Sequence, residues 1–474
     1  MGDHGDDDKK AHVVVLASPG MGHVTPLLEL AKTLVLHLGF HVSFLAIPAE
    51  EASPAQIHLL RSPNLPPDLH VIDLPRAHVS STLRHDMGVF SRLCVVVREA
   101  LRFLPPFLNQ NSVNALITDP FCLAAFDIFD DDDVSVPTYV FFTSSASLLA
   151  LTFYLPTLDE MVVGDYSKIS DEVRVPGCKP LPVEDLINDV LDRQVLPISN
   201  RLPTVAGILL NTWEELEPVT LRSFRETPFF LQIPIPPVYP IGPITKRDPE
   251  PAVKSSTSHA NLISWLDKQP SCSVVYVSFG SGGTLSAEQT NELARGLELS
   301  GQRFVWVARP PAEANASGNF FNAGDEVEDP ATYLEQGFRD RTEGVGMVIS
   351  SWAPQEEVLR HPSIAGFLTH CGWNSLLESI VYGVPMIAWP MYNEQRMNAR
   401  MLIEMGLAVK PEVGEGKRVV GWSEIEKVVR MIVEGEQGML IRSRVREFQN
   451  SALRAFNNGS LACVANQWKV ESGL

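Results

Sequence analysis

The sequence has little positive charge. It carries 38 Lys and Arg residues against 57 Asp and Glu residues, which gives a formal net charge of −19 at pH 7. A chain this acidic is repelled by phosphate backbones and by anionic lipid, so nucleic acid and membrane surfaces are poor candidates as partners. An anionic small ligand is not excluded, because main-chain dipoles can make a local site positive.

Cysteines and long apolar runs are also scarce. The six cysteines are scattered and include no C-x-x-C pair, so neither a zinc site nor a disulfide framework is indicated, and free thiols suit a reducing compartment. No apolar run reaches the roughly 18 residues of a transmembrane helix, and the charged residues 1–12 lack the apolar segment of a secretory signal. We therefore expect a cytoplasmic protein that does not insert into a membrane. Residues 1–12 are left out of the fold prediction, because they could belong in part to an expression tag.

Acidic runs that could bind a metal are few. Residues 6–8 and residues 130–133 contain the D-x-D pattern, which can hold Mg²⁺ or Mn²⁺ against a nucleotide. Both runs are typical of solvated loops. We predict no metal site, with metal use as the weaker alternative.

What is present is an ordinary globular composition. Apolar residues make up 45% of the 474 residues, and at roughly 100–200 residues per domain this length corresponds to two domains, or three. Residues 12–20 form an apolar run that ends at Pro-Gly, residues 24–39 have helical spacing, and residues 41–48 have the pattern of a second strand. This order predicts the start of a parallel, doubly wound sheet. Further strands are predicted at residues 115–119, 138–142 and 207–212.

A second set of elements follows a break in the pattern. Residues 240–259 are rich in proline, serine and charge, which predicts a linker between domains. Beyond it, strands are predicted at residues 273–281, 303–309, 346–350, 365–370 and 385–390. The sequence thus predicts an α/β protein with two parallel sheets, and such sheets bind ligands in the cleft at the carboxyl ends of their strands.

The first candidate binding loop begins at His370. The chain turns through Gly372 into a helix that is expected to start near Asn374 and Ser375. Free N–H groups and the helix dipole make such a start an anion site, to which His370, Asn374 and Ser375 could add donors for a diphosphate. Glu378, one turn further on, could accept two hydrogen bonds from a ribose diol. The alternatives are that Asn374 and Ser375 only cap the helix and that Glu378 is only solvated.

Two more loops offer groups with chemistry. Trp352 precedes Pro354 in a loop and could stack on a flat base, although an isolated tryptophan is more often part of a core. His23 lies in the loop between the first strand and the first helix, where a histidine is well placed to act as a base. Asp119, at the end of a predicted strand, could orient that imidazole; the alternatives are a polar surface histidine and an Asp-Pro turn. Residues 18–26 lack the third glycine of G-x-G-x-x-G, which disfavours a dinucleotide oxidoreductase.

The span from residue 352 to residue 395 resembles the signature box of the plant secondary-product glycosyltransferases. The W-x-P-Q opening, the H-C-G-W-N-S core, the intervening Glu and the closing E-Q pair all agree with that box, and residues 18–32 and 277–289 are also similar to the family. The resemblance covers nearly the whole chain and is nearest to the branch that glucosylates hydroquinone and related small phenols and anilines. It implies the GT-B fold, in which two Rossmann-like domains face a central cleft and the last helix crosses back to the first domain.

The resemblance also implies domain boundaries. Residues 11–245 would form the acceptor-binding domain, completed by residues from about 452 to 474. Residues 246–258 would be the linker, and residues 259–451 would form the domain that binds the UDP-sugar.

The family's roles carry over by position. Trp352 would stack on uracil and the Ala353 main chain would pair with its edge, while Gln355 and Glu378 would hold the ribose. The diphosphate would be bound at Gly372, where the helix begins, by His370, Asn374, Ser375, Ser281 and Ser18. The sugar would be held by Trp373, Glu394 and Gln395, with Thr143 or Ser144 at its 6-hydroxyl. His23 would be the catalytic base and Asp119 its partner. The family usually has Asp at the position of Glu394, and Gln at the position of Gln395 goes with glucose.

The resemblance therefore implies an inverting, metal-independent O-glucosyltransferase that uses UDP-glucose and a small aromatic acceptor. The expected acceptors are phenols such as hydroquinone, monolignols or indoxyl-like alcohols, and a monomer is expected. The alternatives are a non-catalytic nucleotide-sugar binding protein and a variant that uses UDP-galactose or glucosylates nitrogen. The acceptor pocket is expected to be lined by Met87, Phe90, Phe121, Leu149 and Tyr392.

Overall fold

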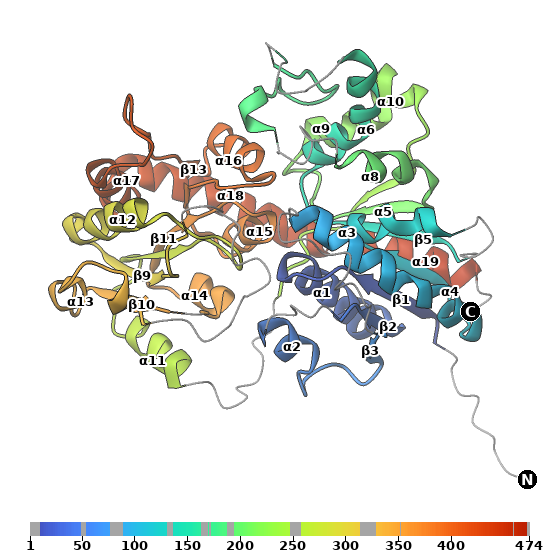
Figure 1. The fold of residues 1–474 in the computed structure, drawn as a ribbon, viewed down its shortest axis with the longest axis horizontal. Coiled ribbons are helices and arrows are strands. Elements are labelled where there is room, and N and C mark those ends of the chain that lie inside the picture. Colours follow the sequence, from blue (N-terminus) through green and yellow to red (C-terminus); the bar gives the residue numbers. More distant parts are fainter. Residues whose placement is uncertain are drawn as a thin grey trace, which may run out of the picture.

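The protein consists of two parallel sheets that lie side by side, each with helices on both faces (Figure 1). The computed structural model describes residues 10–48, 54–75, 89–129, 136–162, 169, 172–186, 194–246, 257–312, 329–350, 352–457 and 459–471. The acidic runs at residues 6–8 and 130–133 and most of the predicted linker lie outside these residues.

The first sheet has seven parallel strands in the order β3-β2-β1-β4-β5-β6-β7. Its central strands are buried along almost their whole length, which explains why they appear in the sequence as continuous apolar runs. The strand order reverses between β1 and β4, and this place is the switch point of the first sheet. The loops that follow these two strands lie next to each other there. The strands are β1 (His12–Ala17), β2 (His41–Ala46), β3 (Leu69–Asp73), β4 (Ala115–Thr118), β5 (Thr138–Phe142), β6 (Gly207–Leu210) and β7 (Val238–Pro240). The helices are α1 (Met21–Leu38), α2 (Pro54–Leu60), α3 (Val89–Ala100), α4 (Leu104–Gln110), α5 (Pro120–Ala124), α6 (Ala146–Met161), α8 (Leu196–Arg201), α9 (Pro218–Glu226) and α10 (Pro228–Gln232).

The second sheet has six parallel strands in the order β10-β9-β8-β11-β12-β13. Here the order reverses between β8 and β11, which gives the second sheet its own switch point. The strands are β8 (Val274–Ser278), β9 (Arg303–Val307), β10 (Gly346–Ile349), β11 (Ile364–Thr369), β12 (Met386–Ala388) and β13 (Ala408–Val409). The helices are α11 (Thr257–Leu266), α12 (Ala287–Ser300), α13 (Phe338–Arg341), α14 (Gln355–Arg360), α15 (Trp373–Val381), α16 (Gln395–Glu404) and α17 (Trp422–Glu434).

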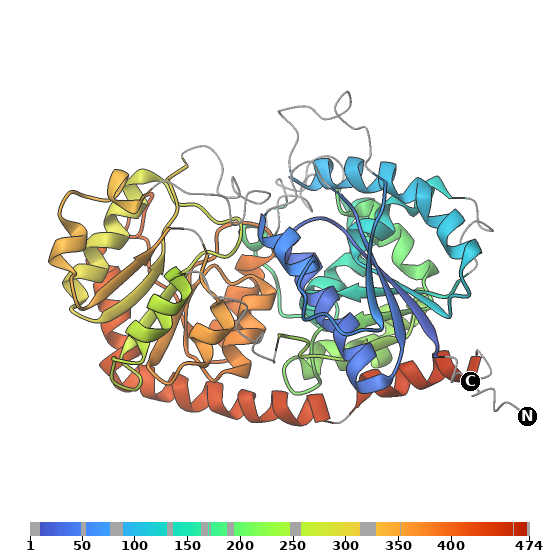
Figure 2. The same cartoon turned by 90° about the horizontal axis from the view of Figure 1, so that it is seen from below.

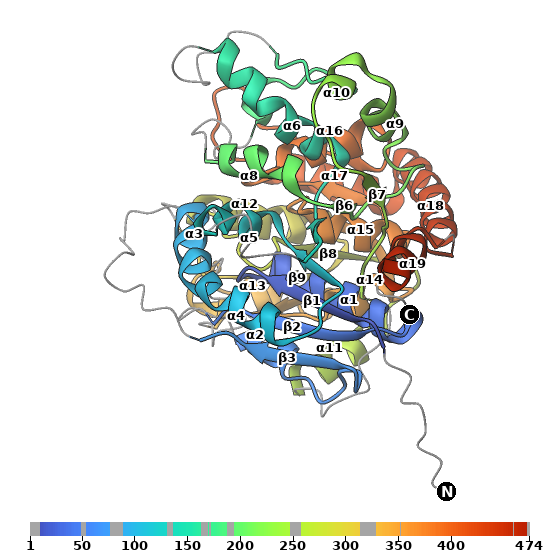
Figure 3. The ribbon, with the colours of Figure 1, turned by 90° about the vertical axis from the view of Figure 1, so that its right-hand side faces the viewer.

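The last two helices connect the two halves. Helix α18 (Glu436–Asn457) packs on α15 and α17, and α19 (Ser460–Glu471) packs on the first sheet. Trp468 of α19 is fully buried against Phe40 and Tyr139. Figure 2 shows the two helices running along both halves, and Figure 3 shows them in succession on one side of the molecule. The predicted crossing of the C-terminal helix to the first domain is confirmed.

Candidate functional site

The first switch point lies against the second half of the chain, and two hydrogen bonds join the two halves there. Both bonds start at the first turn of α15, in the second half of the chain. The Asn374 side-chain amide donates to the Gly22 main-chain oxygen of α1 at 3.0 Å, and the buried Trp373 indole N–H donates to the Asn211 oxygen at 2.8 Å. The helix that follows β1 and the loop after β6 therefore meet the helix that follows β11.

A proline explains why the Gly22 oxygen is available to the other half. In an α-helix this oxygen would accept from the N–H of residue 26, but Pro26 has no N–H. Asn374 supplies a donor in its place. Helix α1 begins at Met21, so His23 lies in its first turn and not in the preceding loop, where the sequence placed it.

His23 and Asp119 lie together at the first switch point. His23 Nδ1 is 3.8 Å from Asp119 Oδ2, which is ion-pair distance but too long for a hydrogen bond. The imidazole packs edge-on against Phe121, with ring centroids 4.7 Å apart. Burial lowers the pKa of His23, and the Asp119 charge opposes this shift only in part. The imidazole is therefore neutral at pH 7, as a general base has to be.

Asp119 is held rigidly by the main chain. Its Oδ1 accepts from Cys122 N–H at 2.9 Å and so caps α5, while Oδ2 accepts from Ser18 N–H at 2.7 Å. The carboxylate is fully buried. Asp119 therefore caps α5 and lies beside His23 at the same time.

The second switch point is built around His370. A Cβ atom added at Gly280 or at Gly372 would lie within 2.5 Å of the His370 ring. Both positions therefore need glycine for the ring to fit. Burial, followed by the positive charge of Arg309, lowers the pKa of His370 to about 4, so this imidazole is neutral. Cys371 takes a left-handed φ of 66° in the turn, and its oxygen accepts from the Asn398 amide at 3.0 Å.

Helix α15 begins without a side-chain cap. Gly372 occupies the cap position and makes no side-chain hydrogen bond, so the alternative in which Asn374 and Ser375 cap this helix is wrong. Asn374 instead donates to Gly22, and the Ser375 hydroxyl accepts from Gln355 at 2.9 Å. The uncapped first turn of α15 leaves main-chain donors and the positive end of the helix dipole for an anion.

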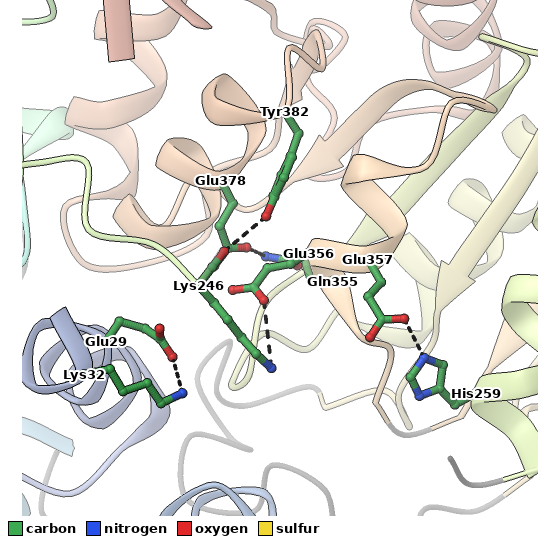
Figure 4. Close-up of polar contacts among 9 residues, drawn as sticks. All are labelled: Glu29, Lys32, Lys246, His259, Gln355, Glu356, Glu357, Glu378 and Tyr382. Carbon is green, nitrogen blue, oxygen red and sulfur yellow. Dashed lines mark hydrogen bonds and ion pairs between the residues drawn. The ribbon is translucent and has the colours of Figure 1, made fainter. Parts of the chain in front are cut away.

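Glu378 and Gln355 form a hydrogen-bonded pair one turn further along α15 (Figure 4). Gln355 Nε2 donates to Glu378 Oε2 at 2.7 Å. Burial raises the pKa of Glu378 to about 7, although Gln355 and Lys246 favour its charged form. Burial and the neighbouring Glu378 also raise the pKa of Glu356, whose carboxylate is 4.0 Å from Lys246 Nζ. Because burial disfavours the charge of Glu378, a ligand that donates a hydrogen bond to this carboxylate would stabilise its charged form.

Trp352 precedes this pair and is 43% exposed, so it is not a core residue. Its indole is the only tryptophan side chain among the large exposed apolar groups of the described residues. Ala353 is buried in the core of the second sheet, and only its main chain is suited to pairing with a ligand. An exposed indole next to a fixed main-chain segment is suited to stacking on a flat ring.

The residues predicted to hold a sugar already form hydrogen bonds within the protein. The Trp373 indole N–H is used by Asn211, so only its main-chain N–H remains, and that group lies at the Glu394 carboxylate. The Gln395 side-chain oxygen accepts from Met391 and Tyr392 N–H at 2.9 and 3.1 Å, which leaves its NH₂ group as a donor. The roles of both residues toward a sugar stay predictions.

Several predicted residues carry a buried polar atom that lacks a hydrogen-bond partner within the described part of the chain. Such atoms are rare in folded proteins and are concentrated at sites that take a ligand or water. They belong to the two switch points and to the Thr143–Ser144 turn after β5: Ser18 Oγ, His23 Nδ1, Ser144 Oγ, His370 Nδ1 and Asn374 Oδ1. Ser281 lies in the loop after β8, and Thr143 is half-buried beside Ser144.

The structure describes only some of the residues that were predicted to line the acceptor pocket. Phe121 lies against His23, and Tyr392 is partly exposed in the loop before α16, where burial raises its pKa to about 12. Leu149 is fully buried in the core of the first half, so the prediction that it lines the acceptor pocket is wrong. Met87 and the side chain of Phe90 lie outside the described residues.

Comparison with known proteins identifies the family. Residues 259–437 match the family model for UDP-glucoronosyl and UDP-glucosyl transferases. Anthocyanidin 3-O-glucosyltransferase 5 of Manihot esculenta is 40% identical over 98% of this chain and 96% of its own length. The chain is a UDP-glycosyltransferase. Hydroquinone glucosyltransferase of Rauvolfia serpentina is 38% identical over 97% of this chain and 98% of its own, and the resemblance found in the sequence is confirmed.

Solved structures agree with this assignment. TcCGT1 in complex with UDP has a TM-score of 0.88 and 43% identity, with 97% of this chain and 99% of that chain covered. UGT2 of Phytolacca americana, complexed with UDP-2fluoro-glucose and pterostilbene, has a TM-score of 0.83 and 38% identity over 97% of this chain and 100% of that chain. The GT-B fold is confirmed, and the oxidoreductase alternative is not supported.

Three functional candidates of this UDP-glycosyltransferase were not recognised in the sequence. Arg309 follows β9, the strand next to β8; Glu217 accepts from the main chain at the start of α6; and Pro26 frees the Gly22 oxygen. A charged residue directly after a buried strand was the available signal for Arg309. Glu217 and Pro26 act through contacts between distant segments, which one sequence does not reveal.

Lowering the pH below about 7 should weaken the binding of UDP to this UDP-glycosyltransferase. A ribose diol donates hydrogen bonds best to an ionised Glu378, whose pKa is raised to about 7 in the free protein. Below that pH the free carboxyl is protonated and must lose its proton on binding, so affinity should fall by up to about tenfold per pH unit. Calorimetric titration with UDP between pH 5.5 and 8.5 measures this slope.

A nucleotide without the diol provides the control. The slope should disappear with 2′,3′-dideoxy-UDP, whose phosphates titrate like those of UDP, and with Glu378→Gln. An equal slope for UDP and its dideoxy analogue would show that Glu378 does not bind the diol.

Proposed function

We propose that this UDP-glycosyltransferase transfers glucose from UDP-glucose to the hydroxyl group of a small aromatic acceptor, with inversion, to give a β-glucoside. The observation that carries the proposal is the pairing of His23 with Asp119 next to the Gly22–Asn374 hydrogen bond. This bond brings the base-bearing helix α1 against the helix that would hold the diphosphate. Binding alone needs neither the imidazole nor its buried carboxylate, which argues against a non-catalytic sugar-nucleotide binding protein.

The donor would lie along the second switch point. Trp352 would stack on uracil and the Ala353 main chain would pair with its edge, while Gln355 and Glu378 would hold the ribose. The diphosphate would lie at the uncapped start of α15 with His370, Asn374, Ser375 and Ser281. The glucose would reach Glu394, the Gln395 NH₂ group and the turn at Thr143 and Ser144.

The reaction would be a single displacement at the anomeric carbon. The acceptor oxygen attacks as His23 takes its proton, and the bond to the UDP oxygen breaks on the opposite face. One displacement inverts the configuration, so an α-linked donor gives a β-glucoside. Asp119 would favour the imidazolium that forms, and the α15 N-terminus would favour the departing diphosphate.

The acceptor class is proposed from the relatives and from the site. The relatives are named for anthocyanidin and hydroquinone, and the Phytolacca americana structure holds pterostilbene, all of which are phenols. Phe121 beside His23 and Tyr392 on the far side would flank a flat aromatic ring. Gln395 is consistent with glucose as the sugar.

We also propose that the reaction needs no metal and that the enzyme acts as a cytoplasmic monomer. Among the described residues, no group of three or more His, Cys, Asp or Glu side chains is arranged to hold a metal ion. Within the same residues, no helix is long and apolar enough to cross a membrane.

Incubation with UDP-glucose and a panel of phenols and anilines tests the proposal. A mass gain of one hexose on a phenol, a diaxial anomeric coupling in the product and equal rates with and without EDTA are expected. Hydrolysis of UDP-glucose or its binding without transfer to any acceptor would contradict the proposal. Preferential use of UDP-galactose would favour the variant with that donor, and preferential use of anilines would favour the variant that glucosylates nitrogen.

A further inference from the structure

Arg309 is a largely buried cation that pairs with no carboxylate in the described part of the chain. Among the residues that the structure describes, no Asp or Glu forms an ion pair with it, and its one hydrogen bond is a long contact of 3.4 Å from Nη1 to the Gly283 oxygen. Burial lowers the pKa of Arg309, and the groups that oppose this shift are tyrosines, which carry no charge at pH 7. An unpaired buried charge destabilises a protein, so it is retained where a ligand supplies the opposite charge.

The position of Arg309 identifies which ligand this would be. The residue follows β9, which pairs with β8, and its contact at Gly283 is in the loop that carries Ser281. In the same loop, Gly280 lies against the His370 ring, and the Arg309 charge lowers the pKa of His370 after burial has done so. The guanidinium therefore lies among the residues proposed for the diphosphate.

A cation is useful there because of the charge balance of the reaction. When the sugar–oxygen bond breaks, its electron pair stays on the β-phosphate oxygen, so negative charge on the diphosphate increases. The protein itself carries a net charge of −19, and the described residues offer no metal cluster to neutralise that increase. A fixed positive charge in a buried site favours such a state more strongly than one in water.

We propose that Arg309 supplies the fixed counter-charge for the diphosphate of the donor, from its position beside the loop after β8. The proposal rests on a UDP-sugar as donor and names a group beyond the signature box. Arg309 favours diphosphate binding and the departure of UDP at the expense of the stability of the ligand-free protein.

The test compares Arg309→Met, Arg309→Lys and Arg303→Met. Arg303 starts the same strand at its opposite end and serves as the matched control. Calorimetry should show that R309M lowers the affinity for UDP by about 10- to 100-fold and the affinity for uridine by less than about threefold. R309K should recover most of the loss, and R303M should bind like the wild type. Turnover of R309M should fall further than its affinity for UDP-glucose, because the charge on the diphosphate increases in the transition state.

The melting temperature of the ligand-free variants separates this role from a structural one. R309M should melt at the same temperature as the wild type or higher, since it removes an unpaired buried charge. A lower melting temperature, failure to fold, or equal losses for uridine and UDP would overturn the proposal. A wild type that binds UDP in this Arg309-dependent way but transfers no sugar would overturn the proposed function and leave this inference standing.

Discussion

Replacing His23 with alanine should lower turnover about 10²–10⁴-fold on a phenol of ordinary acidity, the range typical of a lost general base. His23 is neutral at pH 7 because burial lowers its pKa, and Asp119 lies 3.8 Å away to favour the imidazolium as the proton arrives. The affinity for UDP should stay within about twofold, because His23 does not belong to the donor half of the site. Steady-state kinetics and UDP titration check the two expectations.

Two controls make this result specific. His37→Ala removes an exposed histidine from the last turn of the same helix and should leave turnover unchanged. A strongly acidic phenol, which is already ionised, should be affected much less by H23A than an ordinary phenol. Asp119→Asn should slow turnover as well. It should also lower stability, since asparagine keeps one oxygen that can accept from Ser18 or Cys122 but puts a donor NH₂ group against the other N–H. Turnover of H23A near that of the wild type would remove the base assignment.

The parts of the fold that follow from local pattern were predicted correctly from the sequence. Each predicted strand is present, although most end one to three residues early, because the predicted ranges include the first residues of the loop after the strand. The strands that were not predicted are β3, β7 and β13. Strand β3 contains the exposed His70, β7 is short and ends in Pro240, and β13 has two residues, so none shows an apolar run.

The candidate site was predicted as a set of residues but not as a set of contacts. Local spacing indicated His370, Asn374 and Glu378 because they follow one strand and share one helix. It could not show that Asn374 binds Gly22, or that the Trp373 indole is used by Asn211, since these partners are 352 and 162 residues away. Arg309 illustrates the same limit, because only the folded chain shows that no carboxylate of the described residues pairs with it.

Replacing Glu217 with alanine should have the largest effect on stability, about 2–5 kcal/mol, because three donors, two of them in buried hydrogen bonds, would lose their acceptor. Glu217 accepts from Ala146 N–H at 2.9 Å, from Ser147 N–H at 3.2 Å and from the Thr212 hydroxyl at 2.8 Å. The first two donors are the free N–H groups at the start of α6, so Glu217 holds the end of the turn that carries Thr143 and Ser144. Chemical denaturation measures the loss of stability.

The pH dependence gives this prediction a second readout. Burial raises the pKa of Glu217 to about 7 in the folded protein, above its value of 4.5 in the unfolded chain. Between these values the folded state binds more protons, so Glu217 makes the wild type less stable as the pH rises from about 4.5 to 7, by up to roughly 3 kcal/mol. Glu217→Gln should remove this slope while it keeps part of the hydrogen bonding.

The effect on catalysis should follow from the turn and not from the nucleotide site. With the start of α6 released, Thr143 and Ser144 would lose their fixed position, so kcat should fall while the affinity for UDP stays near that of the wild type. Glu214→Ala is the matched control, since Glu214 is an exposed residue paired with Arg225 at 2.9 Å, and such surface pairs contribute about 1 kcal/mol or less. If E217A were as stable as E214A, the buried carboxylate would not be what holds α6 in place. If its kcat were unchanged despite the lost stability, the turn after β5 would have no part in binding the sugar.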